Sequence, residues 1–118
     1  IRPQTAIRTL FDSSWLSAIQ TPPFPEYPSA HSVVSGSVST FLENYYGKFT
    51  IRDSSEFEFG FGTETFDGFI DAANHACISR LYGGIHFIDG IAKGQDMGNE
   101  LGAYHLKNLI TRRKKSND

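Results

Sequence analysis

Apolar residues recur at helical spacing in several segments of the chain. IRPQTAIRTLF, residues 1–11, has this spacing and carries Pro3 where the first turn of a helix tolerates proline. From Ser29 to about Tyr46 apolar residues return at intervals of three and four, which predicts a second helix with Ser29 as its N-cap. The apolar positions of this second helix are Val33, Val34, Val38, Phe41, Leu42 and Tyr45.

Two further helices are predicted in the second half of the chain. TFDGFIDAANHACISRLY, residues 65–82, has helical spacing, and the Gly-Gly pair that follows would end the helix. A last helix is predicted from about Ile88 to Thr111, where Gly94, Gly98 and Gly102 repeat every four residues. Such a glycine row, like the Gly and Ser residues of the second helix, indicates a face that lies close against another helix.

The segments between these helices are less regular. KFTIRD (48–53) and EFEFGFG (56–62) predict either two short strands or an extended excursion, and the second segment alternates Glu and Phe with a period of two, as a strand would. Residues 12–30 form a loop that ends in the proline-rich part of TPPFPEYPSAHSVVSG (21–36). The pattern therefore predicts an all-α helical bundle of about four helices, in one domain over residues 1–118.

Composition and charge narrow the class of protein. Hydrophobic residues make up 39% of the chain and aromatic residues 14%, which is typical of a globular domain. The net charge of −2, with both signs interspersed, argues against a nucleic-acid partner, and the basic run TRRKKSND (111–118) is interpreted as a solvated helix end. The chain has no run of 18 apolar residues, so the sequence predicts no membrane-spanning helix. Its single cysteine, Cys77, cannot form an internal disulfide.

Three short clusters carry side chains suited to a tetrahedral oxyanion. They are Arg2-Pro3, PSAH (28–31) and SRLYGGIH (79–86). Arginine offers a planar, permanently charged set of donors, and the start of a helix offers backbone amides. Histidine can act as nucleophile, metal ligand or acid/base. Each cluster alone is a weak signal. The proline-rich segment before His31 is either a rigid loop that delivers this histidine to a defined point or a surface connector that ends in an ordinary N-cap.

The joint pattern, Pro-Ser-x-His followed by Ser-Arg, five residues and His, resembles the signature of a known superfamily. This is the type-2 phosphatidic acid phosphatase and vanadium haloperoxidase superfamily. The motif sequences of this chain are most similar to those of its bacterial haloperoxidase-like branch. The resemblance runs from Arg2 to about Gly98. It implies a helical bundle that forms the C-terminal part of the superfamily core, a site at one end of the bundle, and export from the cytoplasm.

The resemblance also implies a role for each matching residue. Vanadate, or phosphate in its place, would be held by four residues, while His31 would be the acid/base and His86 the metal ligand or the nucleophile. The four expected anion-binding residues are Arg2, Ser29, Ala30 and Arg80.

The chain departs from the family pattern at three places. The family's first motif is Lys, six residues and Arg-Pro, so the matching Lys would precede Arg2 by seven positions, and the chain is expected to be incomplete at its N-terminus. Ala30 stands where the family usually has Gly, and a positive φ there would be strained. The family often has Asp four residues after the second His, but here that residue is Gly90, and Asp89 is the predicted orienting partner of His86.

Three functions follow as expectations. The first is a vanadium-dependent haloperoxidase that uses hydrogen peroxide to oxidise a halide. The second is an acid phosphatase that forms a phosphohistidine at His86, and the third is a non-catalytic, truncated anion-binding module. Half a bundle would leave apolar helix faces uncovered, so association with a second copy or with a missing N-terminal part is also expected.

Overall fold

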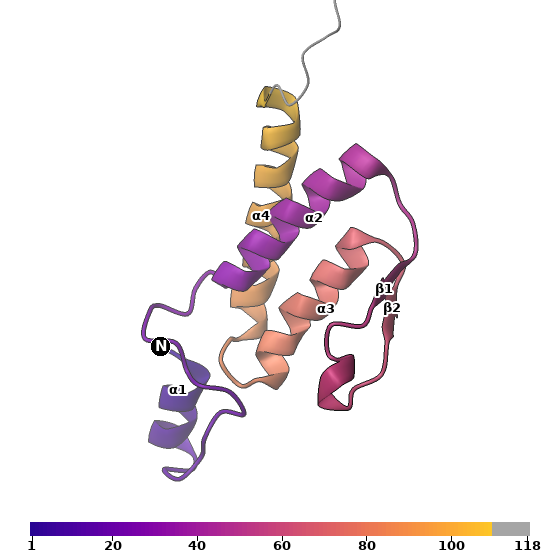
Figure 1. Ribbon diagram of the computed structural model, residues 1–118. Helices are drawn as coiled ribbons and strands as arrows, with labels where there is room; N and C mark the ends of the chain where they lie inside the picture. Colours follow the sequence, from indigo (N-terminus) through magenta and orange to yellow (C-terminus); the bar gives the residue numbers. More distant parts are fainter. Residues whose placement is uncertain (110–118) are drawn as a thin grey trace, which may run out of the picture.

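The computed structural model describes residues 1–109, and within them the predicted helical bundle is confirmed (Figure 1). The described elements, in chain order, are α1 (Pro3–Leu10), α2 (Ala30–Tyr46), β1 (Ile51–Asp53), the short 3-10 helix η1 (Phe57–Phe59), β2 (Glu64–Phe66), α3 (Phe69–Tyr82) and α4 (Ile88–Asn108). None of the described helices is long and apolar enough to cross a membrane.

The main packing contact joins α2 to α4 through small residues. Ser32, Gly36, Ser37 and Ser39 are buried on α2, and Gly90, Gly94, Gly98 and Gly102 are buried on α4. The two backbones lie so close that a Cβ atom on Gly94 would approach the Ser29 carbonyl oxygen to 2.6 Å, and one on Gly102 would approach the Ser37 carbonyl oxygen to 2.6 Å. The predicted close face of small residues is therefore confirmed.

The predicted apolar face of α2 is only partly correct. Val34 and Val38 are 62% and 51% exposed, although their spacing predicted a buried stripe. The small residues between them face α4 instead, because only side chains of that size let two helix backbones approach so closely.

The excursion between α2 and α3 contains one strand pair, with one strand at an unexpected place. β1 pairs antiparallel with β2, with Ile51 opposite Phe66. The predicted strand at 56–62 is wrong, since Phe57–Phe59 forms η1 and Gly60 turns the chain with a φ of +86°. Its alternating Phe side chains find no sheet face to cover, and Phe57 and Phe59 are 69% and 67% exposed.

The ends of α3 and α4 also refine the prediction. α3 begins at Phe69, after Gly68 at a φ of +126°, and the Gly-Gly pair ends it as predicted. Its side chains Ala73 and Cys77 are buried, and burial raises the pKa of the Cys77 thiol. α4 ends at Asn108 rather than Thr111, and Leu109 has left the helix. Residues 110–118, which include the basic run, lie outside the described residues.

The loop between α1 and α2 is fastened at both ends. The side-chain oxygen of Gln4 on α1 accepts hydrogen bonds from the hydroxyls of Ser17 and Thr21, at 2.8 and 2.9 Å. At the other end, Ser29 caps α2 by accepting from the Ser32 amide, and its own amide donates to the Gly90 carbonyl at 2.9 Å. The predicted N-cap is confirmed, and the proline-rich loop is tied to the start of α4.

Replacing Gly98 with alanine is expected to destabilise the domain by roughly 1–3 kcal/mol through overpacking. The added methyl group would overlap the Val33 carbonyl oxygen on α2 and lie 3.0 Å from the Ser37 amide nitrogen. The better helix propensity of alanine, about 1 kcal/mol, offsets only part of this cost. The midpoint of urea unfolding measures the loss.

Gly62→Ala is the matched control, because a Cβ atom there would have no neighbour within 4 Å. Its effect should stay within about 0.5 kcal/mol. Equal unfolding midpoints for the two variants would contradict the close contact between α2 and α4.

Candidate functional site

The turn between α3 and α4 places His86 beside the start of α4. The amides of Ile85 and His86 both donate to the Arg80 carbonyl oxygen, at 3.2 and 3.3 Å, so the Gly-Gly turn folds back onto the last turn of α3. The His86 side chain is 1% exposed. Two members of the third sequence cluster, Arg80 and His86, are thus held close together by the backbone.

The imidazole of His86 lies between a carboxylate and a guanidinium group. Its Nδ1 atom is 3.0 Å from Glu26 Oε1, and its Nε2 atom is 3.0 Å from Arg2 Nη1. A guanidinium can only donate hydrogen bonds, so Nε2 accepts. The proton therefore lies on Nδ1, and this N–H group donates a hydrogen bond to Glu26 Oε1. This arrangement leaves a neutral ring whose lone pair, on Nε2, faces a cation.

Arg2 is a buried cation held by backbone carbonyls of the proline-rich loop. Its Nε atom donates to the Phe24 carbonyl at 3.0 Å, Nη2 donates to the Pro25 carbonyl at 3.4 Å, and Nη1 also donates to the Ile85 carbonyl at 2.9 Å. Its Cζ atom lies 4.8 Å from the centre of the Phe24 ring. Burial lowers the pKa of Arg2, and the nearby Glu26 carboxylate raises it. Arg2 thus joins the first and third sequence clusters through one side chain.

The start of α2 supplies the second cluster. Ser29 is fully buried, whereas Ala30 and His31 lie on the exposed side of the first turn. Ala30 is helical, and no residue other than glycine among the described ones has a positive φ. The expected strain at Ala30 is therefore absent, and its amide remains one of the first-turn donors that have no partner inside the helix.

His31 faces the same positive region as the other clusters. Partial desolvation lowers the pKa of His31 below its ordinary value of 6.5, and the positive charges of Arg80 and Arg2 lower it further. These two arginines belong to the other two clusters. The three motifs, spread over 85 residues of sequence from 2 to 86, therefore meet at the end of the bundle where α2 and α4 begin.

Arg80 is half-buried and folds onto its own neighbour. Its Nε and Nη2 atoms donate to Ser79 Oγ at 3.1 and 2.9 Å. Its positive charge is one of the causes that lower the pKa of His31, after partial desolvation. Arg80 is thus positioned beside the site as a second cation.

The prediction of Asp89 as the partner of His86 needs correction. Asp89 is exposed in the first turn of α4, and the carboxylate that pairs with Nδ1 belongs to Glu26 in the proline-rich loop. Glu26 is only 6% exposed, and its Oε1 also accepts from the Phe87 amide at 3.1 Å. Sequence reasoning missed Glu26, although it is the only acid between residues 13 and 42.

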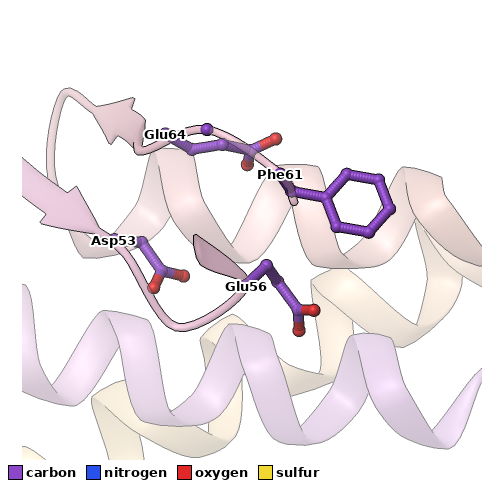
Figure 2. A pocket seen from close by; sticks show the side chains of 5 residues that line it. Asp53, Glu56, Phe61 and Glu64 are labelled. Carbon is purple, nitrogen blue, oxygen red and sulfur yellow. The ribbon is translucent and has the colours of Figure 1, made fainter. Parts of the chain in front are cut away.

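Other candidate side chains lie outside this cluster. His75 is exposed and edge-on to the Phe66 ring, and His105 lies beside Tyr104 near the end of α4. Figure 2 shows a separate hollow in the β1–β2 excursion, lined by Phe61 and by the exposed acids Asp53, Glu56 and Glu64. In residues 1–109 no group of three or more His, Cys, Asp or Glu side chains is arranged to hold a metal ion.

A helical bundle with a buried histidine, two arginines and a helix start at one end defines a domain suited to binding an oxyanion. Residues 2–114 match the family model of the VCPO second helical-bundle domain. The chain belongs to this family, in the vanadium haloperoxidase-like branch.

Solved structures agree with this assignment. The crystal structure of the first bacterial vanadium-dependent iodoperoxidase is similar to this chain, with 44% sequence identity and a TM-score of 0.86 over 93% of it. A bacterial vanadium-dependent chloroperoxidase is 23% identical, with a TM-score of 0.71 over 86% of the chain, and shares the fold. The chain spans 27% and 28% of the lengths of these two proteins. No curated protein matches the sequence.

The environment of His31 leads to a prediction about its titration. In an NMR titration its midpoint should fall below 6.5, because partial desolvation and the neighbouring cations both disfavour the charged ring. Replacing Arg80 with glutamine removes one of those cations and should raise the midpoint part of the way back toward 6.5.

Arg52→Gln is the matched control, since Arg52 lies exposed on β1 and is not among the charges that act on His31. It should leave the midpoint unchanged. An unchanged midpoint in Arg80→Gln would contradict the prediction, because it would mean that the Arg80 charge does not act on His31.

Proposed function

We propose that this domain holds vanadate at His86 and supports the oxidation of a halide by hydrogen peroxide. The observation that carries the proposal is the buried, neutral imidazole of His86, whose Nε2 lone pair is directed at a buried guanidinium. Membership of the vanadium haloperoxidase-like family supports the same assignment. Because the chain spans less than a third of its relatives, activity of the isolated chain is part of the proposal.

The donor set fits a tetrahedral oxyanion with a metal at its centre. Neutral imidazole nitrogen is a common ligand of transition metals, and Nε2 is the ring atom that is not engaged by the carboxylate. Arg2 and Arg80 would neutralise the charge on the oxygens, and the Ala30 amide would donate from the start of α2. Ser29 accepts from the Ser32 amide through Oγ, so its hydroxyl proton can be donated to an anion.

Each residue then has a defined task in the proposed reaction. Vanadate, when bound, would supply the Lewis acidity that activates hydrogen peroxide toward a halide. Arg2 would exchange its bond to Nε2 for a bond to an anion oxygen, while its bonds to the loop carbonyls keep it in place. His31, whose lowered pKa favours the neutral ring at neutral pH, would accept a proton from the incoming peroxide at a ring nitrogen.

An acid phosphatase is the second candidate, and the tautomer of His86 is the observation that favours it. With its proton on Nδ1, His86 has a nucleophilic lone pair on Nε2 that could attack phosphorus and form a phosphohistidine. His31 would then protonate the leaving alcohol. The two reactions use the same anion donors, so they differ in their substrates rather than in the residues that bind them.

Titration calorimetry with orthovanadate tests the proposed cofactor. The chain should bind it, and His86→Ala should weaken binding by more than about 100-fold, because loss of a direct ligand should exceed the 10–100-fold cost of losing an outer-shell partner. His75→Ala is the control, since this exposed histidine contacts Phe66 on the excursion, and its affinity should equal that of the unchanged chain.

Equal binding to the chain and to His86→Ala, or binding to neither, would contradict the proposal. Where binding depends on His86, peroxide-dependent halide oxidation supports the haloperoxidase, and a burst of nitrophenol from a nitrophenyl phosphate supports the phosphatase. Neither activity in a protein that binds would leave the non-catalytic anion-binding module.

The expected association with another copy or a further segment of chain is also testable. Large apolar side chains are exposed on α1 and the loop after it, with Leu10 at 70%, Phe11 at 84% and Leu16 at 69%. Covering them would remove apolar surface from water, so light scattering should find a species larger than one chain. A monodisperse monomer would contradict this expectation.

A further inference from the structure

The carboxylate beside His86 comes from an unexpected part of the chain. Glu26 lies 60 residues before His86, in the proline-rich loop, and not in the helix that follows the histidine. Both a ring N–H and the Phe87 amide donate to its Oε1 atom. Two donors on one buried oxygen hold the carboxylate in a single place, and they explain how the charge of Glu26 is accommodated at 6% exposure.

Gly90 provides the space that Glu26 occupies. A Cβ atom on Gly90 would overlap Glu26 Oε1 and lie 2.9 Å from its Cδ atom. Any side chain at position 90 would therefore have to displace the carboxylate. Conversely, a carboxylate carried by residue 90 itself would lie in the volume that Glu26 now fills, so the two positions can supply only one acid to His86 between them.

We propose that Glu26 is a positioning residue for His86, and that Gly90 is its necessary counterpart. Glu26 holds the proton on Nδ1, so that the Nε2 lone pair stays directed toward the anion site when Arg2 exchanges its bond to Nε2 for an anion oxygen. Its catalytic consequence rests on the proposed function, because it acts through the nitrogen that would bind vanadium or attack phosphorus. Its effect on the tautomer does not.

The origin of the carboxylate gives the proline-rich loop a specific task. Consecutive residues of the loop hold the two partners of the His86 ring, since the Phe24 and Pro25 carbonyls accept from Arg2 and the Glu26 carboxylate accepts from Nδ1. The Ser29 amide then ties the end of this segment to the Gly90 carbonyl. One stiff segment therefore positions both groups that contact the imidazole, the Glu26 carboxylate at Nδ1 and the Arg2 guanidinium at Nε2.

The first test reads the tautomer without any ligand. The ¹⁵N chemical shifts of the two His86 ring nitrogens, assigned with His86→Gln, should show a protonated Nδ1 in the unchanged chain. Glu26→Gln should keep this tautomer, because the Phe87 amide holds an oxygen at the same place. Arg2 alone would also keep Nε2 as the acceptor, so the loss of Glu26 is tested in an Arg2→Leu background. There Glu26→Ala should give a mixture of tautomers, whereas Arg2→Leu with Glu26 in place should keep the proton on Nδ1.

Two combined variants test the relation to Gly90. Gly90→Ala alone should destabilise the chain strongly, whereas Gly90→Ala in the Glu26→Ala background should be much milder, which makes the two effects non-additive. Gly90→Asp added to Arg2→Leu, Glu26→Ala should restore the Nδ1-protonated tautomer with a carboxylate from α4. Additive effects, or no restoration in a folded combined variant, would overturn the pairing of the two positions.

Orthovanadate affinity connects the tautomer to the site. Glu26→Ala should bind about 10–100-fold more weakly, the usual cost of losing an outer-shell partner, and the Glu26→Ala, Gly90→Asp double variant should recover much of that loss. An unchanged tautomer in folded Arg2→Leu, Glu26→Ala would overturn the proposal. The expected tautomers without vanadate binding to any chain would support the positioning role of Glu26 and contradict the proposed function instead.

Discussion

The site depends on one buried imidazole held between a carboxylate and a guanidinium. Glu26 accepts from Nδ1 of His86, and Arg2 donates to Nε2, with all three side chains almost fully buried. A charge placed alone in such surroundings would cost several kcal/mol, so each charge is stable here only because the others are present. Removing one partner would leave an uncompensated charge, which makes the three side chains a single unit.

This unit can form only because the backbones around it approach closely. The glycines of α4 and the small residues of α2 allow the two helices to touch, and their first turns then lie at the same end of the bundle (Figure 1). The bond from the Ser29 amide to the Gly90 carbonyl carries the proline-rich loop to the same place. Larger side chains at the glycine positions would separate the helices and move the loop away from His86. Packing and chemistry therefore rest on the same residues.

The positive character of this end of the bundle follows from the same arrangement. Within the described residues neither Arg2 nor Arg80 forms a direct ion pair with an acid, although the Glu26 carboxylate lies near Arg2. Their charges act instead on His31 and keep its ring neutral at a lower pH than usual. A site with two such cations and a neutral imidazole favours a multiply charged oxyanion over an uncharged ligand.

Sequence periodicity located the helices well, because turn-forming glycines and the Ser29 cap act locally. The Gly-Gly pair ends α3, Ser29 begins α2, and the glycine row of α4 packs as its spacing predicted. The three motifs likewise identified the residues that surround the site, since side-chain chemistry can be read directly from residue type. The prediction of a strand at 56–62 was wrong, because alternating apolar residues form a strand only where a neighbouring strand is present to pair with them.

By itself the sequence determined the helical class and the small-residue face of the close helix contact, because helical spacing and residue size can be read from neighbours within a few positions. Only the tertiary structure decided which acid serves His86. Asp89 is near in sequence but points to solvent, whereas Glu26 is 60 residues away and reaches the ring through space that Gly90 leaves open. That choice depends on how a loop packs against a helix, and the spacing of residues along the chain does not encode it.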